Sequence, residues 1–218
     1  MSNKYEEGIA FILEGDTEKE FYLSLLEFLC KKHDGILERQ LDCSNSPDII
    51  YTLKTPSRHL LIKFNTVNTV TQMPHSSRWF ISQCKNKHRD VGSWIVFLCY
   101  DLDNYKNDIT KFYEGDWVNL RTSLKKKAKA VHDIAAAADI EDIILSDIEG
   151  ISRFLGSPNT MALPTGSKGK AKLKKLFRQA NRTYHEGKRA RALIDSLDMQ
   201  KIMDTSSAPL TMIETVIF

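Results

Sequence analysis

This sequence lacks most of the features that mark specialised protein classes. No window of its 218 residues reaches the apolar length of a membrane-spanning helix, and the polar, acidic stretch 1–7 does not have the pattern of a signal peptide. The cysteines are scattered without the spacing of metal ligands, which argues against a zinc site or a disulfide framework and favours buried thiols in a reducing compartment. They are Cys30, Cys43, Cys84 and Cys99. We therefore expect a cytoplasmic protein with no membrane partner.

Charge and composition exclude little more. The formal net charge is only +3, the hydrophobic content is 42% and the charged content is 27%, all ordinary for a soluble globular protein. The sequence has no internal repeat and no low-complexity segment. Its length suits one large domain or a domain with an appendage, enough to bury a core.

The most informative stretch lies near the middle of the chain. Trp94 to Tyr100 is an unbroken apolar run of strand length, rich in β-branched and aromatic residues, which predicts a strand buried on both faces. Asp101 and Asp103 follow it, two residues apart, so their side chains point the same way at the edge where open α/β sheets bind ligands. Converging carboxylates repel each other, and Mg²⁺ offsets that repulsion. The alternative is that one aspartate caps the next helix and the other is solvated.

A second acidic group follows the first apolar run. Ile9–Leu13 predicts a buried strand, followed by a tight turn at Gly15 and a helix that begins at Thr17, with Thr17 and Glu20 as a capping box. If the two strands are parallel, Glu14 lies at the same sheet edge as the two aspartates. Glu18, in the first helical turn, faces that edge or simply complements the helix dipole.

The remaining elements of the first part alternate between strand and helix patterns, which predicts an α/β fold with a mostly parallel sheet flanked by helices. Residues 44–74 give no clear pattern beyond an apolar patch at 60–64. Glu141 follows the last predicted strand and so occupies another strand-to-helix junction. The predicted elements are a strand over 36–43, a helix over 76–88, a helix over 112–124, a strand over 131–138 and a helix from Asp139.

The C-terminal part changes character. After a loop over 158–169, residues 168–191 are rich in Lys and Arg, with Glu186 as the one acid, and apolar residues continue at helical spacing as far as Tyr184. We predict an amphipathic helix with a basic face, a second helix from about Arg189, and an apolar end that docks on the rest. The domains are then an α/β domain over 1–157 and a basic helical C-terminal extension over 158–218.

The motif Glu14-Gly-Asp-Thr-Glu18, followed by Asp101-Leu-Asp103, resembles the signature of the Toprim domain of topoisomerases, bacterial primases and several nucleases. The Glu-Gly-x-Thr-Glu form looks most like the OLD-type nucleases and the small stand-alone Toprim-like proteins of bacterial defence loci. The resemblance covers roughly 9–156 and implies a Toprim-like, Rossmann-like fold. No zinc ribbon or topoisomerase tyrosine context accompanies it. A Gly-x-x-x-x-Gly-Lys-Ser/Thr motif is also missing, so an ATPase would be a separate partner chain.

The resemblance also implies roles for single residues. Glu14 matches the family's glutamate, credited with acid/base work or metal binding, and Asp101 and Asp103 match its Mg²⁺-binding aspartates, where Mn²⁺ is a substitute. Glu18 matches a further ligand of the nuclease branch. That branch also has a glutamate after the next strand and a downstream lysine. The glutamate is Glu141 or, as the fallback, Glu149; the lysine is Lys168 or Lys170.

These features predict a Mg²⁺-dependent nuclease that hydrolyses phosphodiesters of DNA or RNA in phage defence, with a homo-oligomer left open. A basic helix would track the nucleic-acid backbone. Its candidate residues are Lys172, Lys174, Lys175, Arg178, Arg182, Lys188, Arg189 and Arg191. The main alternative is a non-catalytic module that binds nucleic acid or a partner, such as the effector subunit of an ATPase complex. A phosphotransferase or phosphatase would need an aspartyl nucleophile near the N-terminus, and a nucleotide-sugar transferase would leave the Glu14 motif unexplained.

Overall fold

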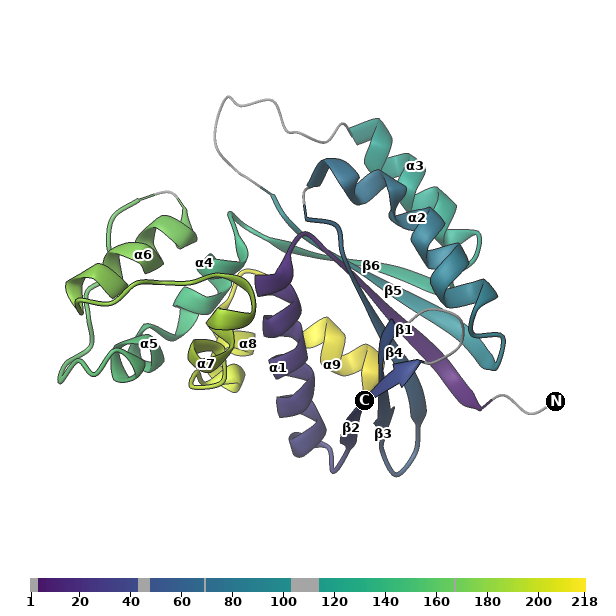
Figure 1. Ribbon diagram of the computed structural model, residues 1–218, viewed down its shortest axis with the longest axis horizontal. Helices are drawn as coiled ribbons and strands as arrows, with labels where there is room; N and C mark the ends of the chain where they lie inside the picture. The colour runs from purple at the N-terminus through teal and green to yellow at the C-terminus, as the bar shows by residue number, and fades with distance from the viewer. Residues whose placement is uncertain (1–3, 43–47, 69, 103–113, 167) are drawn as a thin grey trace.

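The structure is a computed structural model that describes residues 4–42, 48–68, 70–102, 114–166 and 168–218. Its strands form a six-stranded sheet with the order β2-β3-β4-β1-β5-β6 (Figure 1). They are β1 (Tyr5–Leu13), β2 (Ile36–Asp42), β3 (Asp48–Lys54), β4 (His59–Thr66), β5 (Val91–Asp101) and β6 (Ala130–Ala136). The predicted α/β class and mostly parallel sheet are confirmed, because β4, β1, β5 and β6 run parallel while β2 and β3 pair antiparallel at one side.

The two predicted apolar strands are neighbours at the centre of the sheet. β1 and β5 pair in parallel, with Phe11 opposite Phe97 and Leu13 opposite Cys99. Both strands are buried along almost their whole length, as strands covered on both faces must be. Their carboxyl ends therefore lie side by side.

Helices cover both faces of the sheet (Figure 1). On one face lie α1 (Asp16–Lys32) and α9 (Thr211–Ile217), which share a core with Ile9 and Phe11 of β1. On the other lie α2 (Ser76–Trp79), the π-helix η2 (Phe80–Asn86) and α3 (Glu114–Lys125), which pack with Ala10 and Ile12. The alternation of side chains along β1 divides the core in this way. The short 3₁₀-helix η1 (Val70–His75) precedes α2.

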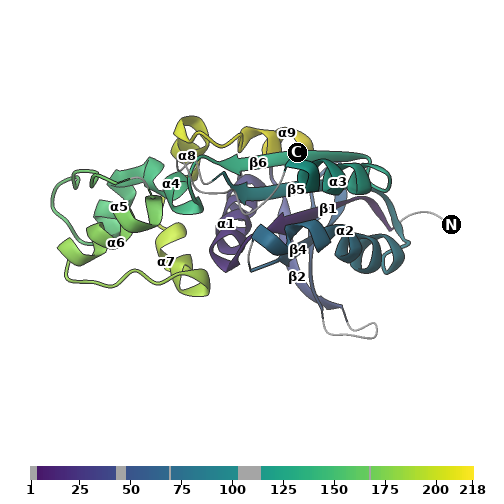
Figure 2. The same ribbon diagram turned by 90° about the horizontal axis from the view of Figure 1, so that it is seen from above.

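The remaining helices gather beyond one end of the sheet (Figure 2). They pack into the same apolar core as α1, through residues such as Ile144, Leu173 and Leu193. They are α4 (Ile140–Ile144), η3 (Leu145–Asp147), α5 (Ile148–Phe154), α6 (Gly169–Gln179), η4 (Gly187–Ala190), α7 (Arg191–Ile194) and α8 (Met199–Thr205).

The apolar C-terminus docks as predicted. Ile213 and Ile217 of α9 are fully buried in the core beside α1. Arg58 fixes the end of this helix, since its guanidinium donates 2.8 Å hydrogen bonds to the carbonyl oxygens of Val216 and Ile217 and also pairs with Glu7 of β1. Carbonyl groups at a helix C-terminus have no partner within the helix, so a cation there stabilises the helix end.

Two local predictions were wrong. The first helix begins at Asp16 after an extended Gly15 and has no side-chain cap, so the capping box of Thr17 and Glu20 does not form. The basic helix ends at Gln179 instead of continuing past Tyr184. Asn181 there adopts a left-handed conformation with φ of 54°, and the amides of Asn181 and Arg182 donate to the carbonyls of Arg178 and Phe177. This is a Schellman ending, which closes a helix whatever the periodicity of the residues beyond it.

Other expectations can be compared directly. The described cysteines, Cys30, Cys84 and Cys99, are buried free thiols, as predicted, and Cys43 lies outside the described residues. Within the described ranges, no helix combines the length and apolar character needed to cross a membrane.

Gly8 is required by the close packing of the two central strands. It lies opposite Trp94, and a Cβ atom at Gly8 would stand 2.6 Å from the indole ring, which is only 1% exposed. We expect Gly8→Ala to lower the free energy of unfolding by about 1–3 kcal/mol, measured by urea denaturation, because the ring has nowhere to move. Trp94→Phe in the same chain should restore part of the loss. A Gly8→Ala protein as stable as the wild type would contradict this packing.

Candidate functional site

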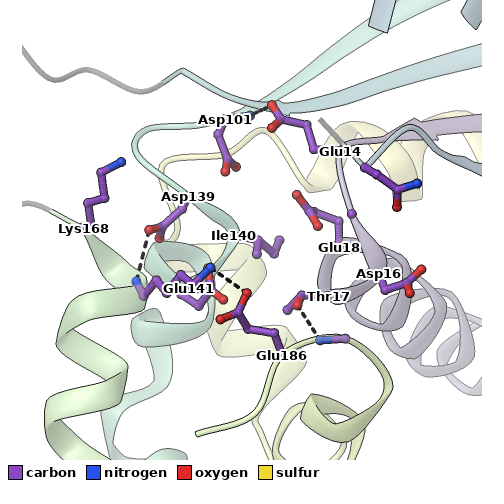
Figure 3. Close-up of a pocket in the computed structure, with 14 residues that line it drawn as sticks. Glu14, Asp16, Thr17, Glu18, Asp101, Asp139, Ile140, Glu141, Lys168 and Glu186 are labelled. Atoms are coloured by element: carbon purple, nitrogen blue, oxygen red, sulfur yellow. Dashed lines mark hydrogen bonds and ion pairs between the residues drawn. The ribbon is translucent and has the colours of Figure 1, made fainter. Parts of the chain in front are cut away.

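The carboxyl ends of β1 and β5 bring together the first two predicted site residues. Glu14 follows β1 directly, and its Oε1 accepts a hydrogen bond of 3.0 Å from the backbone amide of Asp101, the last residue of β5 (Figure 3). The expectation that Glu14 and Asp101 share one sheet edge is therefore confirmed. Asp103, the other predicted aspartate, lies outside the described residues.

The first turn of α1 adds a third carboxylate. Glu18 is 7% exposed, although a glutamate in a first helical turn is usually solvated. Its side chain points toward Asp101 and Glu14 in Figure 3 rather than outward. The turn is fixed from the C-terminal part of the chain, because the amide of Gly187 donates a 2.8 Å hydrogen bond to Oγ1 of Thr17. Of the two alternatives considered for Glu18, the structure shows the orientation toward the sheet edge.

The junction between β6 and α4 supplies two more carboxylates, those of Asp139 and Glu141. Asp139 caps α4, accepting a hydrogen bond from the amide of Asp142, and its second oxygen accepts one of 3.1 Å from the amide of Lys170 at the start of α6. Glu141, in the first turn of α4, is 4% exposed and accepts a 3.0 Å hydrogen bond from the hydroxyl of Tyr184. Asp139 thus joins two helices, while Tyr184 fixes the orientation of the Glu141 carboxylate.

These side chains surround one cavity of about 500 Å³ (Figure 3). Of the two glutamates considered for the third acidic position, Glu141 lines this cavity, whereas Glu149 is exposed and pairs with Lys201 elsewhere at 2.8 Å. The cavity is lined by Glu14, Gly15, Asp16, Thr17, Glu18, Asn68, Asp101, Asp139, Ile140, Glu141, Lys168, Lys170, Glu186 and Gly187.

Burial and mutual repulsion make these acids hold their protons. Burial first, and then the carboxylates of Glu18 and Glu14, raises the pKa of Asp101 to about 9. Burial, with the charges of Glu14 and Glu141, raises the pKa of Glu18 to about 7. Burial and the nearby Asp139 likewise raise the pKa of Glu141 to about 7. Carboxylates so perturbed within one cavity are typical of functional sites, where a cation or substrate compensates the charge.

Lysine side chains of the C-terminal part lie at the rim of this carboxylate cavity. Both predicted lysines, Lys168 and Lys170, line the cavity. Nζ of Lys170 forms a 2.6 Å ion pair with Glu186, and Lys174, one helical turn further along α6, contacts the other oxygen of Glu186 at 3.3 Å. Glu186 was considered in the sequence only as an exception within a basic stretch.

Several of the predicted nucleic-acid-binding residues contact the protein itself. Lys172 pairs with Asp142 at 3.3 Å, and Lys175 donates to the carbonyl oxygen of Thr165 at 2.9 Å. Arg182 donates to the Phe154 carbonyl at 2.8 Å and lies over the ring of that residue.

Arg191 is a further internal contact of this kind, since it bridges α7 to α1 by pairing with Glu20 and Glu27 and also pairs with Asp195. The exposed members of the predicted set are Lys175, Arg178, Arg182, Lys188 and Arg189, whereas Lys172, Lys174 and Arg191 are half-buried.

Three residues of the site were missed as functional candidates. Asp139 follows a strand and opens a helix, so its position could have singled it out. Tyr184 and Glu186 gave no such signal, because the pattern placed them on one continuous helix. Only the Schellman ending after Gln179 turns the chain back, so that Tyr184 reaches Glu141 and Glu186 reaches the rim.

The chemistry of the donors suits a hard divalent cation, since Mg²⁺ and Mn²⁺ prefer carboxylate oxygens. Within the described ranges, however, no group of three or more Asp, Glu, His or Cys side chains is arranged so that it could hold a metal ion. The described carboxylates are therefore a set of suitable ligands rather than a completed cage.

Comparison with known proteins adds no assignment. No protein-family model matches the chain, and no curated protein matches it.

Proposed function

We propose that this protein is a Toprim-like, Mg²⁺-dependent nuclease that hydrolyses phosphodiester bonds of DNA or RNA, with Mn²⁺ able to replace Mg²⁺. The observation that supports the proposal most is the contact of Glu14 with the amide of Asp101. It unites two motifs that lie 87 residues apart in the sequence at the sheet edge where α/β proteins bind ligands. Glu18 and Glu141 stand around the same cavity.

The residues take distinct roles in this proposal. Glu14, Glu18, Asp101 and Glu141 would hold the cation, with Asp103, outside the described residues, as a further ligand. Bound Mg²⁺ supplies charge neutralisation on the phosphate and lowers the pKa of a coordinated water. Glu14 and one of Lys168 and Lys170 are the candidates for proton transfer and for stabilising charge at the reacting phosphate.

The surroundings of this reaction are part of the proposal. The Lys and Arg residues of 168–191 would contact the nucleic-acid backbone, in a C-terminal extension packed on the Toprim-like part. We propose that the protein acts in the cytoplasm in phage defence, and an ATPase, if required, would be a separate chain.

The alternative is a non-catalytic module that binds nucleic acid or a partner chain. The lack of a completed metal cage among the described residues favours it. A protein that binds nucleic acid but cleaves neither DNA nor RNA with Mg²⁺ or Mn²⁺, and whose melting temperature neither cation changes, would support this alternative and reject the nuclease.

The nuclease proposal predicts that Mg²⁺ and Mn²⁺ bind more tightly as the pH rises. A carboxylate must lose its proton to bind a cation, and these carboxyls hold their protons above the ordinary values of 3.8 and 4.5, up to about 7 for Glu18 and Glu141 and about 9 for Asp101. Metal affinity should therefore increase through this window and level off above it. Because the groups interact, the increase should follow the cluster as a whole.

The measurement is isothermal titration of the purified protein with Mn²⁺ at a series of pH values, together with cleavage of labelled DNA and RNA and its loss in EDTA. Bound cation should also raise the melting temperature, since a ligand that binds only the folded state stabilises it. Mn²⁺ affinity that is independent of pH from 4.5 to about 9 would contradict the assignment of these carboxyls as ligands.

A further inference from the structure

The side chain of Glu186 stands between two lysines on the rim of the carboxylate cavity. Lys170 contacts its Oε2 at 2.6 Å and Lys174 its Oε1 at 3.3 Å, so the two ammonium groups hold one carboxylate from both sides. Residues four apart on a helix lie on one face, so α6 presents both lysines in the same direction. In Figure 3 the dashed line that ends on the labelled Glu186 carboxylate marks this ion pair, in which Lys170 is the unlabelled partner.

This ion pair is exposed to solvent. All three side chains are about two-fifths exposed: 41% for Lys170, and 43% for both Lys174 and Glu186. Exposed ion pairs contribute little to stability, because water competes for each charge. An anion with more acceptor oxygens and with further contacts along the same helix would displace the carboxylate.

Such contacts lie next to the pair. A second cavity of about 260 Å³ is lined by Lys174, Arg178, Arg182, Thr183 and Tyr184. Lys174 thus belongs both to the pair that holds Glu186 and to this second cavity. Tyr184 contacts both cavities. It lines the second cavity, and its hydroxyl donates a hydrogen bond to Glu141, which lines the carboxylate cavity.

We propose that Lys170 and Lys174 form a binding site for a backbone phosphate of nucleic acid, in which the Glu186 carboxylate stands until the phosphate displaces it. The next phosphate of the strand would enter the cavity of Arg178 and Arg182. The proposal rests on the proposed function for its class of substrate, because it leads the strand from these cations to the carboxylates. Successive cations on one helix face suit a phosphodiester backbone better than a single free anion.

The test measures binding of fluorescein-labelled single-stranded DNA and RNA by anisotropy in EDTA, where no cleavage occurs. Glu186→Gln should bind about three- to tenfold more tightly than the wild type, because an internal competitor and a repulsive charge are both removed. The matched control is Glu149→Gln, which breaks a similar exposed pair with Lys201 and changes the net charge equally, away from the cavity. It should change the affinity less than twofold.

The same substitution is then made in a Lys170→Ala, Lys174→Ala background. There the gain from Glu186→Gln should vanish, and the slope of log affinity against log salt should fall by about 0.7 for each lost lysine. Equal effects of Glu186→Gln and Glu149→Gln, a gain that persists without the lysines, or no binding by any variant would overturn the proposal. Because binding is measured without metal, this test does not depend on cleavage. The phosphate site can therefore be supported in a protein that cleaves nothing, and it can be rejected in an active nuclease.

Discussion

Asp101→Asn should lower the rate of nucleic-acid cleavage by roughly 10³-fold or more. Asparagine keeps the shape of the side chain but removes the charge that a divalent cation requires. Losing several kcal/mol of charge stabilisation corresponds to a factor of this size, at about 1.4 kcal/mol for each tenfold change. The stabilisation of the protein by Mn²⁺ should disappear in the same variant. Both effects are measured on one preparation, by cleavage of labelled oligonucleotides and by thermal unfolding with and without Mn²⁺.

Without metal, Asp101→Asn should make the protein more stable than the wild type at alkaline pH. The pKa of Asp101 is raised from 3.8 to about 9 by burial and by neighbouring carboxylates, so between these values the folded protein keeps a proton that the unfolded chain has lost. The stability of the wild type therefore falls as the pH rises through this window. The amide introduced by Asp101→Asn cannot ionise, so the variant should lose less stability and be the more stable of the two proteins at alkaline pH.

Matched control substitutions distinguish an effect on the candidate site from a general effect of removing an acidic charge from these strands. Asp90→Asn changes an exposed aspartate just before the same strand, and Glu6→Gln changes an exposed glutamate on β1, whereas Glu14→Gln changes the glutamate at its end. Glu14→Gln should resemble Asp101→Asn in activity, and the two controls should resemble the wild type. Cleavage at the wild-type rate by Asp101→Asn, measured after re-purification, would show that this carboxylate is not part of an active site.

The second large effect is expected at Gly169, where α6 meets α4. A Cβ atom on Gly169 would overlap the amide nitrogen of Asp142 and an oxygen of Asp139 and would stand 2.7 Å from the carbonyl carbon of Glu141. Two of these three atoms belong to the backbone and cannot turn away as a side chain would. We expect Gly169→Ala to cost about 3 kcal/mol of stability and to move α6, with Lys168 and Lys170, away from the cavity.

Gly115→Ala is the control for this substitution. No atom stands within 4 Å of a Cβ built there, and Gly115 is itself exposed in the first turn of α3, so alanine should stabilise the helix by about 0.5–1 kcal/mol. Urea denaturation measures both variants, and cleavage or nucleic-acid binding reports the displacement of the lysines. Unchanged stability of Gly169→Ala would mean that α4 and α6 are not in the close contact described.

Much of the sheet could be predicted because its signals are local. The apolar runs around Phe11 and Phe97 are long enough, and bounded by polar residues sharply enough, to define buried strands whatever lies elsewhere in the chain. An acidic residue follows each run directly. If the two strands are parallel, their carboxyl ends lie at one edge of the sheet, so Glu14 and Asp101 are predicted to share that edge. β3 and β4 were not recognised as strands, and residues 60–64 of β4 were noted only as an apolar patch. β3 is an antiparallel strand whose pattern is defined by pairing with β2 and β4 rather than by burial on both faces.

The C-terminal part shows the limit of periodicity. The spacing of Leu173, Leu176 and Phe177 predicted α6 correctly, but the same spacing continues to Tyr184, where the chain is no longer helical. A left-handed Asn181 ends the helix, and asparagine is common in many other conformations. Nothing in the local sequence distinguishes this ending from an exposed residue of a longer helix.

Local sequence patterns are enough to predict the strands at the centre of the sheet and the edge at which Glu14 and Asp101 meet. Hydrophobic period and chain direction are local properties, and they suffice for these features. The orientation of Glu18, the bridge that Asp139 makes between two helices, the contact of Tyr184 with Glu141 and the place of Glu186 between Lys170 and Lys174 are seen only in the packed structure. Such contacts depend on how the C-terminal helices pack against α1 and α4. Packing is a property of the whole core and not of any one segment.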